Sequence, residues 1–376
     1  MLLLISLIIA AYVVARLVIP LPLGVGGKIL LSGIILLIAC KHMFMFFCGG
    51  LASPELPVPI LIIINWLFGA LLLLFFLLII KDAVGLVLWC SGKLGLKLAL
   101  PFSRMQWAAG LSLLAMLLAA YGMWQAIKAP AINTMEVVVP RLPKGLDGLS
   151  LVQITDMHTC ALFPAPRTQA IVELTNSLHP DIILFTGDMI DGTVENRSQD
   201  VAPLRELKAT YGIYGSLGNH EYYSGLSAWR RAFAGLGIVM LENSHTVLNI
   251  KDNPLVIVGV TDPVAAQFRQ PVPDIEKALA GAPHGAVRIL LAHQPKEALN
   301  YARAEVDLQL SGHTHGGLIV GLTYLVQKFN AGFVAGWYEV GATRLYVSSG
   351  AGLWNGLPLR LGVPAEITHI ILRCPD

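Results

Sequence analysis

LSLVQITDMH (149–158) is the stretch that decides the fold of the second half of this chain. It is an apolar run of strand length that ends in Asp156 and His158, whose side chains point the same way on an extended chain. Four more apolar runs end in Asp, Asn or His, and they are DIILFTGDMID (181–191), YGIYGSLGNHE (211–221), VRILLAH (287–293) and DLQLSGHTHGG (307–317). Helical patterns lie between strands at 167–178 and 226–236, so the sequence predicts an α/β layered core.

The polar residues at these strand ends are candidates for a metal site. Ligands bind at the carboxyl edge of an α/β sheet, so we expect the polar side chains to meet there. Carboxylate, amide and imidazole ligands without a thiolate suit Mn²⁺, Fe or Zn²⁺. Each motif alone is weak, because a single His or Asp at a strand end often has a structural role. Their joint occurrence, each after an apolar strand, favours a metal-dependent enzyme.

The ordered motifs Asp-x-His, Gly-Asp-x-x-Asp, Gly-Asn-His-Glu, a late His and Gly-His-x-His resemble those of the calcineurin-like metallophosphoesterases. The match covers about 148–372. The segments GNHEYY, LLAHQP and LSGHTHGG resemble those of a subgroup of multi-span membrane enzymes of this family. The resemblance implies a four-layer αββα domain, in which helices flank two β-sheets, and a phosphoesterase activity.

The resemblance also implies a role for each motif residue, position by position. The first of two divalent metal ions would be held by Asp156, His158 and His315. The second would be held by Asn219, His293 and His313, and Asp188 would bridge both ions. A hydroxide shared by the metals would attack phosphorus. His220 would protonate the leaving oxygen, and Asp191 would orient His220. The alternative for Asp191 is a helix cap.

Three departures from the family pattern concern the pocket. Gly192 follows Asp191 where phosphoprotein phosphatases of this superfamily have Arg, which argues against that class. Leu318 follows GHTHGG where close relatives often have Gln. Cys160 stands where many relatives have Gly, and it is either a small residue of the pocket wall or a catalytic thiol. Pairing of Cys160 with Cys374 as a disulfide is left open.

The first half of the chain predicts a membrane region. Charged residues make up only 13% of the whole chain, against about 25% in a typical soluble protein. Four apolar segments are long enough to span a bilayer, and they are 1–20, 29–50, 59–80 and 107–127. We therefore predict a four-helix transmembrane domain (1–127), a linker with an edge strand (128–147) and the metallophosphoesterase domain (148–376). The segment 83–100 is predicted to lie at the membrane interface.

The positions of the basic residues predict the orientation of these spans. The loop at about 81–106 contains four Lys or Arg, and Lys28 lies in the short loop after the first span, whereas the loop around 51–58 has none. Basic loops face the cytoplasm, so the catalytic domain is predicted outside it. Lys41, within the second span, either snorkels to the interface or holds the phosphate of a lipid head.

The predicted function is that of an integral-membrane dimetal phosphoesterase whose substrate is lipid-linked or associated with the cell envelope. One alternative is a pyrophosphatase acting on a nucleotide-linked lipid such as UDP-diacylglucosamine, which requires a cytoplasmic site. Another is an inactive membrane sensor or scaffold. Membrane lipids are expected partners. A net charge of +2, from 26 basic and 24 acidic residues, does not indicate a nucleic-acid partner.

Overall fold

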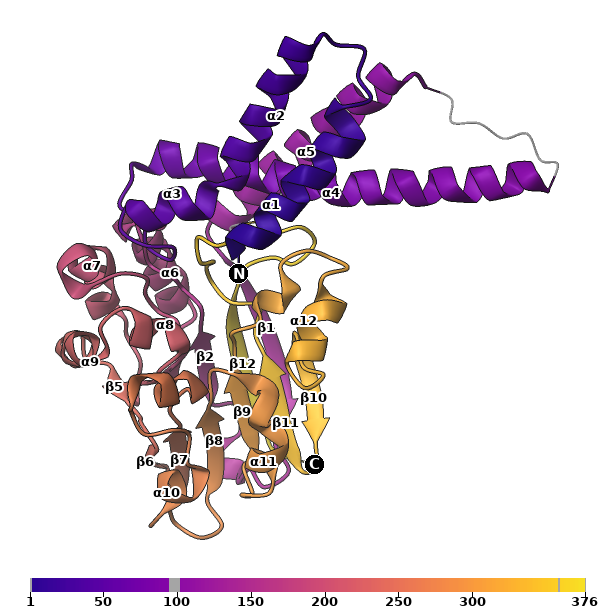
Figure 1. Cartoon of the computed structure of the whole chain (residues 1–376). Helices are drawn as coiled ribbons and strands as arrows, with labels where there is room; N and C mark the ends of the chain where they lie inside the picture. Colours follow the sequence, from indigo (N-terminus) through magenta and orange to yellow (C-terminus); the bar gives the residue numbers. More distant parts are fainter. Residues whose placement is uncertain (1, 95–101, 358, 376) are drawn as a thin grey trace. The chain divides into compact units, whose positions relative to one another are not determined.

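The computed structural model describes residues 2–94, 102–357 and 359–375 (Figure 1). The chain divides into two compact units. The first comprises Met1–Trp124 together with the short segment Asn355–Leu359. The second comprises Gln125–Trp354 and Arg360–Asp376. A segment of five residues from the far end of the sequence therefore belongs to the helical first unit.

Apolar helices build the first unit. They are α1 (Leu2–Val13), continued by a π-helical turn (Val14–Val18), α2 (Val25–Ala39), α3 (Lys41–Phe47), α4 (Val58–Lys93) and α5 (Arg104–Ile127). By length and composition, α4 and α5 can each cross a membrane. The pair α2 and α3 reaches that length only together and is bent by 52° between them, and the helix at Leu2–Val18 is shorter. Of the four predicted spans, the structure thus clearly supports two.

Helix α4 is longer than the sequence analysis predicted. It continues past residue 80 to Lys93, because no proline lies between Pro59 in its first turn and Pro101. Residues 83–93 of the segment predicted at the membrane interface extend this long helix, and their location relative to a membrane stays a prediction. Residues 95–100 of that segment lie outside the described residues.

Lys41 is buried inside the first unit, with 2% of its surface exposed. Its ammonium donates hydrogen bonds to the carbonyl of Asn355 at 2.9 Å and to that of Gly356 at 3.2 Å. The amide of Asn65 also donates to the side-chain oxygen of Asn355 at 3.2 Å. The expectation that Lys41 snorkels is wrong, because backbone carbonyls satisfy its charge within the protein. The same contacts use two of the three donors of the ammonium.

Two six-stranded sheets form the centre of the second unit. The first has the order β1 (Ala131–Val138), β12 (Glu366–Arg373), β2 (Ser150–Ile154), β3 (Ile182–Thr186), β4 (Ile213–Ser216), β5 (Val239–Met240). The second has the order β10 (Gly336–Val340), β11 (Thr343–Val347), β9 (Leu308–Ser311), β8 (Val287–Leu291), β7 (Asn253–Gly259), β6 (Ser244–Ile250). The parallel runs β2-β3-β4 and β7-β8-β9 end at the functional motifs.

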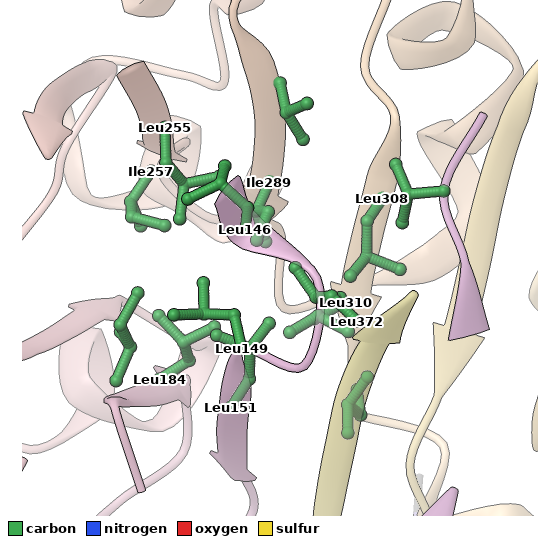
Figure 2. Packing of buried hydrophobic residues seen from close by; sticks show 14 of the residues in the cluster. Leu146, Leu149, Leu151, Leu184, Leu255, Ile257, Ile289, Leu308, Leu310 and Leu372 are labelled. Carbon is green, nitrogen blue, oxygen red and sulfur yellow. The ribbon is translucent and has the colours of Figure 1, made fainter. Parts of the chain in front are cut away.

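The two sheets face each other across an apolar core. Figure 2 shows Leu151 and Leu184 of the first sheet opposite Leu255 and Ile257 of the second. Full burial of each such side chain contributes about 1.5–3 kcal/mol. Helices α6 (Ala165–Ser177), α7 (Val194–Val201) and α9 (Leu226–Gly235) cover the outer face of the first sheet. Helices α10 (Ile275–Leu279) and α11 (Ala298–Ala302) cover the second, which completes four layers.

The predicted strands are present, but two strands were missed, the edge strand β10 and the inner strand β12. The edge strand expected within 128–147 is β1, which lies at the end of the first sheet. The strand β12 lies between β1 and β2, parallel to the former and antiparallel to the latter. The first three residues of β12 are all buried, and its later ones alternate between buried and half-buried. The segment 366–373 is rich in β-branched residues, and this was the sequence signal that indicated a strand.

Candidate active site

The strands deliver the predicted metal ligands to one edge of the sheets. Asp156 and His158 follow β2, Asp188 follows β3, Asn219 begins the short helix α8 (Asn219–Tyr223) after β4, and His293 follows β8. His313 and His315 follow β9. Five of these residues adopt a left-handed backbone conformation, and they are Asp156, His158, Asp188, His313 and His315. Such conformations cost about 1–3 kcal/mol each and gather where surrounding structure must aim a side chain.

Asp156, His158 and His315 form one group of buried side chains whose ligand atoms lie within 4.8 Å of one another. The Nε2 atoms of His158 and His315 are 3.2 Å apart, and Nε2 of His315 is 3.5 Å from Oδ1 of Asp156. Three buried acceptor groups that converge in this way repel one another unless a cation lies between them. This donor set therefore fits a divalent metal ion.

Asp188, His293 and His313 form a second group of the same kind. Nδ1 of His293 donates to the carbonyl of Thr186 at 2.7 Å, so the lone pair is on Nε2, which is buried without a hydrogen-bond partner. A histidine oriented by its other ring nitrogen is the usual arrangement at a metal. Asn219 joins this group, because its Oδ1 lies 3.1 Å from Nδ1 of His313.

Asp188 lies between the two groups. Its Oδ2 is 3.2 Å from Nε2 of His293 in the second group and 3.7 Å from Nε2 of His158 in the first. It is also 3.9 Å from Nε2 of His220. One carboxylate thus reaches both candidate metal positions, which is the arrangement that a bridging ligand requires.

His220 belongs to a third group of converging side chains, with His158 and Asp191, in which Asp191 holds its imidazole. One carboxylate oxygen of Asp191 accepts a short hydrogen bond from Nδ1 of His220, and the other accepts one from Nδ1 of His158 at 3.1 Å. Burial alone would lower the pKa of His220, but the charges of Asp191 and Asp188 outweigh it and raise the pKa to about 10. Thr193, not Asp191, occupies the N-cap position of α7, so the helix-cap alternative for Asp191 is wrong.

Glu221 is a supporting residue to which the sequence analysis gave no role. It is fully buried, and its two carboxylate oxygens accept the backbone N–H groups of Asp188 at 3.0 Å, Met189 at 2.7 Å and Gly218 at 2.7 Å. Burial, and then the charge of Asp188, raise the pKa of Glu221 to about 7. The residue ties the loop after β3 to the loop after β4. Its position in the Gly-Asn-His-Glu motif was the sequence feature that could have indicated this role.

Gly218 shows how closely these two loops approach. A Cβ atom at this position would lie 2.2 Å from Oδ1 of Asp188 and 2.5 Å from its backbone nitrogen. No side chain fits in that space, so glycine is required beside the candidate bridging carboxylate.

Cys160 does not have the properties of a nucleophile. It is fully buried, and burial together with the charge of Asp191 raises the pKa of its thiol to about 12. Because the thiolate is the reactive form, this residue stays inert at neutral pH. No disulfide joins it to Cys374 within the part of the chain that the structure describes. The alternative of a catalytic thiol is therefore disfavoured, and the role as a small residue of the pocket wall stays a prediction.

The comparisons with known proteins show the family. A family model described as "Calcineurin-like phosphoesterase" matches residues 149–317. The chain is 32% identical over 374 residues to "Transmembrane protein with metallophosphoesterase domain" of Danio rerio, covering 89% of this chain and 85% of the relative. It is 33% identical over 307 residues to an uncharacterized metallophosphoesterase of Campylobacter jejuni, covering 80% and 78%. The chain therefore belongs to the calcineurin-like metallophosphoesterases and is a phosphoric ester hydrolase.

Proposed function

We propose that this chain is an integral-membrane phosphoesterase that uses two divalent metal ions to hydrolyse a lipid-linked or envelope-associated phosphoester outside the cytoplasm. The observation that carries the proposal is the position of Asp188 between two groups of converging ligands. The first ion would be held by Asp156, His158 and His315. The second would be held by Asn219, His293 and His313, and Asp188 would contact both.

Mn²⁺, Fe and Zn²⁺ all suit this mixture of carboxylate, amide and imidazole ligands. Two such cations neutralise phosphoryl oxygens and lower the pKa of a water molecule to near neutrality. The buried carboxylates and imidazoles of this chain hold the charge in place and exclude bulk water. The protein therefore supplies a preorganised anionic cradle rather than a covalent nucleophile.

His220 would deliver the proton that the leaving oxygen needs. Its Nδ1 is committed to Asp191, which leaves Nε2, 3.9 Å from Oδ2 of Asp188, to face the reacting group. The raised pKa keeps the imidazole protonated at neutral pH. Two bound cations would lower that pKa again towards the operating range of a general acid, because like charges disfavour the protonated form.

For the membrane region we propose four crossings, with the bent pair α2–α3 and the short helix α1 counted as two of them. Arg16 and Lys81 pair with the same carboxylate, Asp82, at 2.6 and 3.2 Å. The basic ends of α1 and of the membrane-crossing part of α4 thus meet, which favours one cytoplasmic face. Cysteine labelling from each side of the membrane tests this. If a cysteine introduced by His284→Cys is labelled only from the cytoplasm, the proposed topology is wrong.

Attachment to a bilayer favours a substrate that is itself held there. A pyrophosphate bond in a nucleotide-linked lipid remains the alternative, and it requires a cytoplasmic catalytic unit, so the same labelling experiment separates the two. An inactive sensor or scaffold is disfavoured, because all seven ligand positions, His220 and Asp191 are intact and brought together.

The decisive experiment measures turnover by the purified full-length chain with Mn²⁺ and an aryl phosphate monoester or diester. We expect hydrolysis that a chelator abolishes and Mn²⁺ restores. Asp188→Asn should lower it strongly and His220→Ala to a smaller extent, because an activated aryl leaving group needs little protonation, whereas His284→Ala, a change at an exposed histidine, should not lower it. Absence of metal-dependent turnover in the unmodified chain, or unchanged turnover in both site variants, would contradict the proposal.

A further inference from the structure

A cavity of about 470 Å³ lies in the helical first unit, among the π-helical turn after α1, helix α4 and the start of α5. Its wall includes three basic side chains that are far apart in sequence, Arg16, Lys81 and Arg104. These residues come from three separate helical segments. Figure 1 shows the helices concerned. The proposed phosphoesterase activity makes no use of this cavity.

The charges around the cavity are unbalanced. Asp82 accepts hydrogen bonds from Arg16 at 2.6 Å, Lys81 at 3.2 Å and the hydroxyl of Tyr12 at 2.7 Å. Its single negative charge offsets one of three cations. Arg104 has no carboxylate partner among the residues that the structure describes. Arg16 uses only its Nε for Asp82, so the rest of its guanidinium fork is available to a second anion.

The rest of the wall is apolar. Leu21, Leu78 and Leu111 line the same cavity, together with the ring of Trp107. The ring of Phe102 packs edge-on against Trp107, with centroids 5.6 Å apart. A free phosphate ion would leave this apolar surface unfilled. A phospholipid would place its phosphate against the cations and its glycerol and acyl carbons against the leucines.

We infer that this cavity binds the phosphate group of an anionic phospholipid, with Arg16, Lys81 and Arg104 as its ligands. Arginine forms paired hydrogen bonds to phosphate oxygens, and lysine adds a point charge. Basic pockets between membrane helices are suited to such head groups. The capping pair at Ser103 and Gln106, at 2.9 and 3.3 Å, fixes the start of α5 and hence the position of Arg104.

The test is native mass spectrometry of the full-length, detergent-purified chain with phosphatidylglycerol or phosphatidylcholine added in equal amounts. We expect the unmodified chain to retain phosphatidylglycerol preferentially. The double variant Lys81→Gln and Arg104→Gln should bind it about 25-fold more weakly, about fivefold for each lost cation. The matched control is Lys28→Gln with Lys93→Gln, which removes two positive charges that do not line the cavity.

Three outcomes would overturn the inference. The first is equal retention of the two lipids by the unmodified chain. The second is an equal loss in the control double variant, which would indicate attraction to net charge alone. The third is displacement of the lipid by soluble glycerol phosphate at equal concentration, which would identify a site for a free phosphoester. Unchanged thermal unfolding of the Lys81→Gln, Arg104→Gln chain excludes misfolding, and an Arg104→Lys variant should retain most of the binding.

Discussion

The carboxylate of Asp191 accepts a hydrogen bond from Nδ1 of His220. Its second oxygen accepts one from Nδ1 of His158, a residue of the first candidate metal group. One buried carboxylate therefore orients both a candidate metal ligand and the candidate general acid. Because Asp191 also stabilises the positive form of His220, position and proton affinity of that imidazole depend on the same residue.

Asp191→Asn should lower kcat by about 10- to 100-fold. The loss of negative charge should also lower the pKa of His220, which that charge now helps to raise to about 10. A general acid acts in its protonated form, so activity of the metal-loaded enzyme is present below the pKa of His220, which the two cations hold lower than in the metal-free protein, and is lost as the pH rises through it. The alkaline limb of the pH–rate profile should therefore move to lower pH. An unmoved limb would contradict the orienting role, and Asp252→Asn, at an exposed position, is the control.

His220→Asn should lower kcat by about 10²- to 10⁴-fold for an alkyl phosphoester. The loss should be much smaller for a nitrophenyl ester, because that leaving group departs without a proton. Comparison of the two substrates with the same variant measures this difference. Equal losses on both would mean that His220 acts on the metal centre instead. Metal content should be unchanged, since His220 is not one of the proposed ligands.

Single ligand substitutions should separate the two metal positions. His315→Ala removes a member of the first group and His293→Ala a member of the second, so each variant should bind about one ion in place of two. Asp188→Asn should weaken both, because its carboxylate reaches both groups. Elemental analysis of the purified proteins gives the stoichiometry. Full occupancy in either histidine variant would show that the assigned ligand is wrong.

Glu221→Gln should destabilise the catalytic unit. The carboxylate accepts three backbone N–H groups, and an amide cannot replace it, because its NH₂ end would face one of these donors. A buried donor without an acceptor costs about 1–3 kcal/mol. Thermal unfolding should show a lower midpoint than that of the unmodified chain or of Glu276→Gln, which lies at an exposed helix position. Equal midpoints would mean that the loops hold each other without Glu221.

Lys41→Met should destabilise the helical unit. The change leaves the carbonyl of Asn355 without its buried donor, at a cost of about 1–3 kcal/mol, whereas the carbonyl of Gly356 keeps Nε2 of His42 at 3.3 Å. Lys28→Met is the matched control, because Lys28 donates to the carbonyl of Ile19 at an exposed position. Protease sensitivity of the segment 355–359 in detergent should rise only in the Lys41 variant. Equal protease sensitivity of the two variants would contradict the role of Lys41 in holding this segment.

The sequence was most informative where the chemistry is local. Each candidate ligand follows the end of an apolar strand by two to four residues, so the strand supports the prediction of the motif, and all seven predicted ligands reach one edge. Glu221 shows the limit of such reasoning. It stands in the same motif, yet its role depends on backbone groups of Asp188 and Met189, 32 or 33 residues away.

The order of short motifs by itself determined the family and predicted a metal site at one edge of the sheets, because strand periodicity and ligand type are properties of neighbouring residues. Only the tertiary structure decided that Lys41 donates to carbonyls 314 and 315 residues away, that the second apolar segment bends at Cys40, and that Arg16, Lys81 and Arg104 meet around one cavity. Burial and charge pairing depend on which distant segments come together, and the local pattern of residues does not contain that information.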